Sequence, residues 1–172
     1  MYAVTPGEGI KVPVVGRLRW EVVAGLAAAV LVLDLGTKRA IRGTLALGES
    51  RDLLPFLELR HHANDGAAFG LLSGRQSFIL VAVGLAMAAV VAYVFLDRRL
   101  VAAVAGGLLV GGSLGNLVER VAYGRVTDFL QLPHYPTFNV ADIFIVAGVG
   151  LMAITLVRDY LRGPSEGGSA DA

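Results

Sequence analysis

Two aspartates in apolar surroundings are the residues of this sequence best suited to chemistry. Asp128 lies in Gly-Arg-Val-Thr-Asp-Phe-Leu and Asp142 in Phe-Asn-Val-Ala-Asp-Ile-Phe, so neither belongs to a charged surface stretch. Two carboxylates held close together cannot both ionise easily and tend to share one proton. Such a pair can hydrolyse a peptide bond, because one member takes a proton from water while the other donates one to the carbonyl oxygen. Taken singly, each fits an interfacial aspartate at a helix start, favoured by the helix dipole.

A third carboxylate, Asp34, precedes Lys38 by four residues. In a helix this spacing places both side chains on one face, one turn apart, where their charges can neutralise each other. A carboxylate at the centre of a membrane-spanning helix costs at least about 2.5–3.5 kcal/mol, so such groups occur in pairs, at the interface or for function. The spacing therefore favours a structural ion pair.

Other catalytic groups have weaker support. The sequence contains no cysteine, which removes disulfides, thiolate zinc sites and a cysteine nucleophile. No zinc-site spacing connects the three histidines, which are His61, His62 and His134. Ser113 has no nearby base, and Asp65-Gly-Ala-Ala departs from a phosphatidyltransferase metal motif because Phe69 stands where that motif needs arginine. We therefore expect neither a metal nor a cofactor.

The elements that must position these residues are membrane helices. Of 172 residues, 55% are hydrophobic and only 17% charged, whereas soluble domains have about 25% charged residues. Residues 76–96 and 100–118 carry no charge, and each run is long enough to span a bilayer, which takes about 20 residues. The apolar runs 22–33 and 143–157 reach that length only if the aspartate at their edge joins the helix. We therefore expect four transmembrane helices, near 20–40, 76–96, 100–118 and 139–158.

Four helices place the first and third connections, 43–75 and 119–138, on the same face of the membrane. The polar residues in or beside these connections should then converge on one end of the bundle; they are Asp34, Lys38, Asn64, Asn116, Arg120, Asp128, Asn139 and Asp142. The turn Asp97-Arg98-Arg99 carries two arginines, which favours a cytoplasmic turn and cytoplasmic termini. The polar end should therefore be extracytoplasmic.

Two further patterns refine this fold. Residues 56–62 begin with an apolar–polar alternation typical of a half-buried strand, and Asp65-Gly66 offers turn chemistry, so a small platform is expected there. Glycines recur every fourth residue in the third helix, at positions 107, 111 and 115, which favours close approach of another helix backbone.

The chain is expected to form one membrane domain between two cytoplasmic tails. The N-terminal apolar stretch lacks the small-residue cleavage site of a secretory signal, so we interpret it as a helix. The expected organisation is a tail over 1–19, the membrane domain over 20–158 and a tail over 159–172, disordered from Gly163 onward. The net charge of +1, without a basic block, indicates no nucleic-acid partner.

Five segments in order resemble the lipoprotein signal peptidases (signal peptidase II). They are Asp34-Leu-Gly-Thr-Lys38, Asn64-Asp-Gly-Ala-Ala-Phe-Gly70, Gly115-Asn116-Leu-Val-Glu-Arg120, Gly124-Arg-Val-Thr-Asp128-Phe and Phe138-Asn139-Val-Ala-Asp142. Each segment is weak evidence alone, but their order relative to four helices is specific. One departure is Glu119, where the family usually has aspartate, which bears on how Arg120 is held.

The resemblance implies an all-α membrane protein, a four-transmembrane-helix bundle with a small extracytoplasmic β-platform. It implies an aspartic endopeptidase with Asp128 and Asp142 as catalytic residues. The residues implied to bind substrate or support the active site are Asn64, Asn116, Arg120, Asn139, Asp34 and Lys38. The implied substrate is a diacylglyceryl-modified prolipoprotein, cut before its lipidated cysteine. We further expect a monomer in the bacterial cytoplasmic (inner) membrane, with the lipid bilayer and the prolipoprotein as its partners.

Two other classes of protein remain as alternatives. A small transporter or channel would use its aspartates as a proton or ion relay and would place polar residues across the bilayer depth. In this sequence the third and fourth helices are polar at one end only. A structural membrane scaffold would tolerate replacement of both aspartates.

Overall fold

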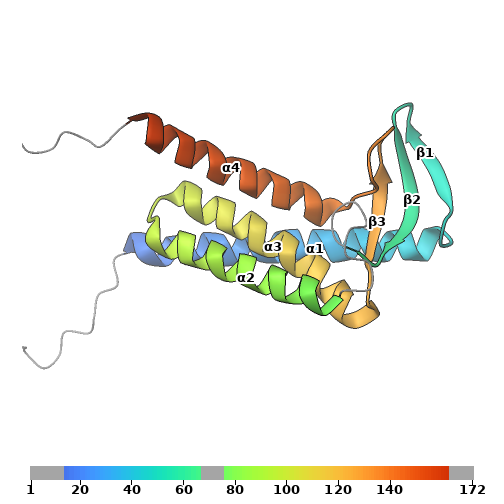
Figure 1. The fold of residues 1–172 in the computed structure, drawn as a ribbon, viewed down its shortest axis with the longest axis horizontal. Helices are drawn as coiled ribbons and strands as arrows, with labels where there is room; N and C mark the ends of the chain where they lie inside the picture. The colour runs from blue at the N-terminus through green and yellow to red at the C-terminus, as the bar shows by residue number, and fades with distance from the viewer. Residues whose placement is uncertain (1–13, 67–75, 163–172) are drawn as a thin grey trace, which may run out of the picture.

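The computed structural model describes residues 14–66 and 76–162, which form four helices and three strands (Figure 1). In chain order these are α1 (Val14–Thr44), β1 (Ser50–Leu54), β2 (Leu57–Asn64), α2 (Gln76–Leu96), α3 (Leu100–Tyr123), β3 (Val126–Gln131) and α4 (Val140–Arg162). The expected disordered tail from Gly163 lies outside the described residues, as do residues 67–70 of the second family segment.

Among the described residues, three helices are long and apolar enough to cross a membrane: α2 from Ser77, α3 and α4. Helix α1 has 31 residues and packs against α3 and α4, but it is not one of these three. The expectation of a mostly helical membrane protein is confirmed, and three of the four expected spans are present. Helix α1 begins at Val14 and ends at Thr44, so Asp34 and Lys38 lie well inside it, whereas the sequence placed them near its end.

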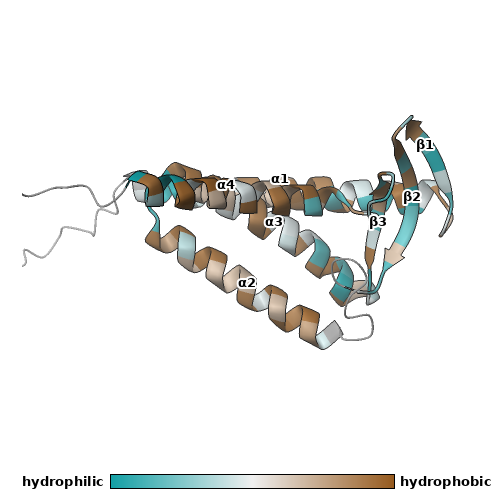
Figure 2. Ribbon diagram, turned by 45° about the horizontal axis from the view of Figure 1, so that its top comes forward, coloured by the Kyte–Doolittle hydropathy of each residue, from teal (hydrophilic) through white to brown (hydrophobic). Residues whose placement is uncertain are grey.

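Helix α3 lies at the centre of the bundle and contacts the other three helices. Its glycines make this possible. A Cβ atom at Gly107 would lie 2.8 Å from the Cβ of Leu26, and one at Gly111 would lie 2.8 Å from the carbonyl oxygen of Ala27. The close approach predicted from the glycine spacing is therefore confirmed, and α1 is the helix that approaches. Away from these contacts the bundle is apolar and exposed, most clearly along α2 (Figure 2).

A three-stranded antiparallel sheet, ordered β1-β2-β3, covers one end of the bundle (Figure 1). The strand expected over 56–62 is present as β2, with alternating burial along most of its length. Strand β3 was missed: it lies in the third connection, and its residues Asp128 and Val126 pair with His62 and Asn64. The first and third connections thus meet at the same end, as the helix count predicted. We call this the sheet end of the bundle.

Two details of the sheet differ from the sequence expectation. The hairpin between β1 and β2 turns at Pro55-Phe56, where the fixed φ of proline suits a turn. The chain also bends at Asp65-Gly66, where the Gly66 N–H donates to Asn64 Oδ1 over 3.0 Å. That bend directs the chain out of the sheet and does not close a hairpin.

The opposite end of the bundle is closed by charged side chains around the α2–α3 turn. Arg99 forms ion pairs with Asp97 at 2.6 Å and with Asp159 of α4 at 2.7 Å. Arg19 of α1 is buried and donates to the carbonyl oxygens of Val94 and Asp97, at the end of α2. The contacts of Arg19 tie α1 to this turn, and the pair of Arg99 with Asp159 ties α4 to it.

Candidate active site

The two aspartates come from different elements that meet at the sheet end. Asp128 lies on β3 and is 2% exposed, whereas Asp142 lies in the first turn of α4 and is half-buried. The start of α4 fixes the position of Asp142. Its backbone N–H donates to Asn139 Oδ1 over 3.1 Å, and the Asn139 N–H donates back to Asp142 Oδ2 over 3.1 Å. This reciprocal pair satisfies two N–H groups that a helix start leaves without intrahelical partners.

Asn139 joins the two carboxylates. Besides its contacts with Asp142, its Nδ2 donates to Asp128 Oδ1 over 2.6 Å and to Asn116 Oδ1 over 3.0 Å. The second oxygen of Asp128 accepts from Asn64 Nδ2 over 2.8 Å, and Asn116 Nδ2 donates to Asp142 Oδ1 over 2.9 Å. Three asparagines therefore hold both carboxylates in one hydrogen-bonded network.

The ion pair predicted between Asp34 and Lys38 is present at 2.7 Å, and both side chains are fully buried. The pair also connects three helices. Lys38 Nζ donates to Asn116 Oδ1 of α3 over 2.8 Å, and Asp34 Oδ1 accepts the Ala141 N–H of α4 over 2.9 Å. Because an ammonium group only donates hydrogen bonds, Asn116 must present its oxygen to Lys38. Its NH₂ group is thereby directed to Asp142.

A second buried carboxylate contact was missed in the sequence. Glu119 is 1% exposed and pairs with Arg42 of α1, while its Oε2 accepts the Thr127 N–H of β3 over 2.7 Å. The sequence related Glu119 to the way Arg120 is held, whereas its carboxylate fastens α1 and β3 to α3. Arg42 follows Lys38 by four residues, as Lys38 follows Asp34. The helical spacing that predicted the pair of Asp34 and Lys38 could therefore have placed Arg42 on the same face of the helix.

Most of the predicted site residues line one cavity of ≈ 630 Å³ at the sheet end. The six that do so are Asn64, Asn116, Arg120, Asp128, Asn139 and Asp142. Arg120 donates to the Gly66 carbonyl oxygen over 3.0 Å. Tyr135, Ile145 and Val146 add apolar surface to the same wall. Asp34 and Lys38 do not line the cavity and act on it only through Asn116 and the start of α4.

The environment of Asp128 favours its protonated form. Burial raises the pKa of the Asp128 carboxyl to about 6, opposed by the hydrogen bond from Asn64. The charge of Asp142 raises this pKa further, while the hydrogen bond from Asn139 lowers it. A carboxyl with this pKa can hold or release a proton near neutral pH, which suits acid–base chemistry.

His62 lines the cavity and is the strand partner of Asp128, whereas the other two histidines lie apart from this chemistry. His61 Nδ1 is 2.9 Å from the Leu45 carbonyl oxygen, and His134 occupies a left-handed backbone position with φ of 59°. Within residues 14–66 and 76–162, no group of three or more His, Cys, Asp or Glu side chains could hold a metal ion. In that part of the chain, the residues gathered for chemistry are carboxylates, amides and a guanidinium.

The fold and the site define a class: a small helical membrane protein whose two carboxylates share a polar cavity at one end of the bundle. Its fold is similar to that of a solved bacterial membrane enzyme, with a TM-score of 0.80 and 33% identity, over 87% of this chain and 95% of that chain. A second solved bacterial membrane enzyme gives a TM-score of 0.75 and 35% identity, over 81% and 94% of the two chains.

Residues 26–158 match the family described as signal peptidase (SPase) II. The lipoprotein signal peptidase of Symbiobacterium thermophilum is 38% identical over 145 residues, which cover 80% of this chain and 95% of the relative. That of Staphylococcus haemolyticus is 36% identical over 141 residues, covering 78% and 89%. The chain therefore belongs to the signal peptidase II family and is a membrane peptidase.

Proposed function

We propose that this protein is an intramembrane aspartic endopeptidase that removes the signal peptide from diacylglyceryl-modified prolipoproteins by cutting before the lipidated cysteine. The observation that carries the proposal is the bridge through Asn139, which brings the carboxylates of Asp128 and Asp142 to one cavity wall. The substrate class is supported by the relatives, which are named lipoprotein signal peptidases.

In the proposed reaction, Asp142 accepts a proton from water while the water oxygen attacks the scissile carbonyl carbon. Asp128, whose raised pKa favours the neutral carboxyl, donates its proton to the carbonyl oxygen. The resulting gem-diol then collapses: Asp142 gives its proton to the leaving nitrogen, the carbon–nitrogen bond breaks, and a hydroxyl proton returns to Asp128. Both carboxyl groups end as they began, and no covalent intermediate forms.

The remaining site residues are proposed to support this pair. Asn116 and Asn139 set the hydrogen bonds of the two carboxylates, and the pair Asp34–Lys38 holds Asn116 in place. Arg120 already donates to a backbone carbonyl at the cavity. It can bind a carbonyl of an extended signal peptide in the same way, and Asn64 supplies a second polar contact at the same wall.

A site at the end of a membrane bundle suits a lipidated substrate. Each acyl methylene buried in the bilayer contributes about 0.8 kcal/mol, so the substrate does not leave the membrane readily. The cavity combines its polar wall with Ile145 and Val146 of α4, and Val146 is 69% exposed on the bundle surface. We propose that acyl chains stay against this apolar surface while the peptide bond reaches the carboxylates.

The proposed placement completes the functional assignment. Helix α1 is proposed as the fourth span, and the sheet end as the extracytoplasmic side of the bacterial inner membrane. The sheet end contains the cavity, and the opposite end carries the arginines of the α2–α3 turn, which favours a cytoplasmic location for that turn. One chain supplies all the named site residues, which supports a monomer as the active form.

The direct test is cleavage of a diacylglyceryl-modified prolipoprotein by the purified protein in detergent or lipid. We expect release of the signal peptide, with the lipidated cysteine as the new N-terminal residue of the product. The same precursor without the diacylglyceryl group serves as the substrate control. An Asp142→Asn preparation of matched purity detects contaminating protease. A well-folded wild-type protein that leaves the lipidated precursor intact would contradict the proposal.

A further inference from the structure

The tip of the β1–β2 hairpin exposes three large apolar side chains away from the active-site cavity. Leu53 is 53% exposed, Leu54 47% and Phe56 59%. None of them lines the cavity that holds the two carboxylates. We call these three residues the hairpin tip. An exposed apolar cluster of this kind on a membrane protein indicates contact with lipid or with another protein.

A bulge in β1 gathers these side chains on one face. Asp52 pairs with Glu58, but the next pair along the hairpin is Leu54 with Leu57, so β1 contains one extra residue there. In a regular strand neighbouring side chains point to opposite faces. A bulge breaks the alternation and re-aims a side chain. As a result Leu53 and Leu54 project to the same side.

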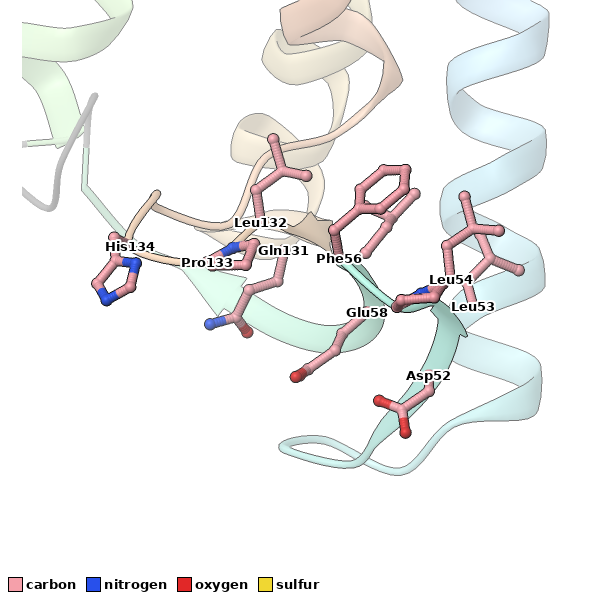
Figure 3. A pocket seen from close by; sticks show the side chains of 11 residues that line it. Asp52, Leu53, Leu54, Phe56, Glu58, Gln131, Leu132, Pro133 and His134 are labelled. Atoms are coloured by element: carbon pink, nitrogen blue, oxygen red, sulfur yellow. The ribbon is translucent and has the colours of Figure 1, made fainter.

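The hairpin is amphipathic as a consequence. Leu53, Leu54 and Phe56 point toward the side on which the helical bundle lies, and Leu132 from the segment after β3 does the same (Figure 3). Polar side chains of the same region point the other way; they are Asp52, Glu58 and Gln131 (Figure 3). A groove of ≈ 580 Å³ runs between the hairpin and the segment after β3.

The apolar face looks toward the side on which the apolar helices lie (Figure 3). The sheet covers the end of the bundle, and the hairpin continues sideways beyond β3 (Figures 1 and 2). The apolar surface of α4 reaches up to this end, where Ile143 is 46% exposed and Val146 69% exposed. The hairpin tip therefore continues the lipid-facing surface of the spanning helices.

We propose that the hairpin tip is a lipid-binding surface, in which Leu53, Leu54 and Phe56 insert into the apolar part of the leaflet at the sheet end. Asp52 and Glu58, on the opposite face, remain in water, because charged carboxylates stay out of the acyl region. Their negative charge also disfavours the reverse orientation against anionic lipid.

The insertion would fix the depth of the active site. Strand β2 is the second strand of the hairpin and also pairs with β3, where His62 lies opposite Asp128. A tip held in the leaflet therefore holds Asp128 at a constant height above the acyl chains. This role concerns the position of the protein in lipid, so it stands or falls independently of the cleavage reaction.

The test uses the natural absence of cysteine from the chain. Single variants Leu54→Cys and Phe56→Cys, and the matched controls Asp52→Cys and Glu58→Cys, are spin-labelled in the full-length protein. The proteins are reconstituted in phosphatidylethanolamine–phosphatidylglycerol vesicles. Collision rates are measured with oxygen, which concentrates in lipid, and with a nickel chelate, which stays in water.

We expect labels at 54 and 56 to collide mainly with oxygen and labels at 52 and 58 mainly with the chelate. The logarithm of the ratio of the two collision rates should therefore change sign between the two faces of the hairpin. Labels at 54 and 56 that collide with the chelate as often as those at 52 and 58 would overturn the proposal. Low collision rates with both reagents at 54 and 56 would show burial against a protein, either another copy or a partner, and would overturn it equally.

A second measurement guards against disturbance by the label. Phe56→Trp and Glu58→Trp are each made in a Trp20→Phe background, which leaves one tryptophan per chain. Vesicles containing lipids brominated on their acyl chains should quench the fluorescence of tryptophan at 56 and leave that at 58 nearly unchanged. Equal quenching at the two positions would contradict insertion of the tip.

Discussion

At the scale of single residues, Asn139 is hydrogen-bonded to both carboxylates. It caps α4 with its backbone N–H and side-chain oxygen, and the same side chain donates to Asp128. One residue thereby couples the start of α4 directly to strand β3. The catalytic proposal rests on this coupling, so its sharpest tests are substitutions of the aspartates themselves.

Asp128→Asn and Asp142→Asn keep the size of each side chain but remove its acid–base chemistry. If the two aspartates act as one unit, each single change should abolish most turnover, and the double change should cost little more. Cleavage of the lipidated precursor by purified variants measures this effect. Asp34→Asn is the comparison, because it should lower the melting temperature by leaving Lys38 buried without its partner. Substantial cleavage by Asp128→Asn or Asp142→Asn in a folded preparation would show that other carboxylates catalyse the reaction.

The pH dependence follows from the pKa of Asp128, which burial raises to about 6. The proposed acid must be protonated, so kcat/KM should fall as the pH rises through about 6. Asn64 donates to the ionised carboxylate and so lowers this pKa. Asn64→Ala should therefore shift the alkaline limb of the profile to higher pH, whatever it does to the maximal rate. A limb that stays in place, or moves to lower pH, would argue against Asp128 as the acid.

At the scale of elements, the bundle depends on close contact between α1 and α3. Gly111 packs so tightly that a Cβ atom there would lie 2.8 Å from the Ala27 carbonyl oxygen. A backbone oxygen cannot move aside as a flexible side chain can. Lys38 donates across the same helix interface to Asn116 of α3, so distortion of the interface would also disturb the network around the carboxylates.

Gly111→Ala should therefore destabilise the protein by about 1–3 kcal/mol, because overpacking forces backbone shifts. Gly84→Ala in α2 is the matched control, since nothing lies within 4 Å of a Cβ atom there. That change should be neutral or stabilise by up to about 1 kcal/mol through helix propensity. Thermal unfolding in one detergent compares the two. Equal melting temperatures for both variants would refute the close packing of α1 on α3.

At the scale of the whole molecule, the sheet end and the opposite end have different chemistry. The cavity, the sheet and the hairpin tip lie at one end, and the ion pairs of Arg99 with Asp97 and Asp159 lie at the other. Burial of the site at a single end agrees poorly with an ion or proton relay, which needs polar groups across the bilayer depth. The orientation of the two ends in the membrane is a separate question.

Orientation can be measured by labelling single cysteines in intact cells with a reagent that does not cross membranes. Ser50 begins β1 at the sheet end, and Ser165 follows α4 in the sequence. If the sheet end is extracytoplasmic, Ser50→Cys should react and Ser165→Cys should react only after the cells are opened. The reverse pattern would overturn the proposed orientation and place the cavity on the cytoplasmic side.

The sequence by itself determined the features that depend on near neighbours in the chain. Uninterrupted apolar runs predicted α2 and α3, and the four-residue spacing of Asp34 and Lys38 predicted their ion pair. Apolar–polar alternation predicted β2. These inferences succeed because helix and strand periodicity places residues a few positions apart in known relative directions.

Only the tertiary structure decided which distant residues meet. The contact of Asn64 with Asp128, the pairing of Arg42 with Glu119 and the existence of β3 join segments far apart in the sequence. Each depends on strand register and on how closely two helix backbones approach, which a periodic pattern does not specify. The bulge that turns Leu53 to the face of Leu54 is of the same kind, because one extra residue in a strand is defined only by the strand that pairs with it.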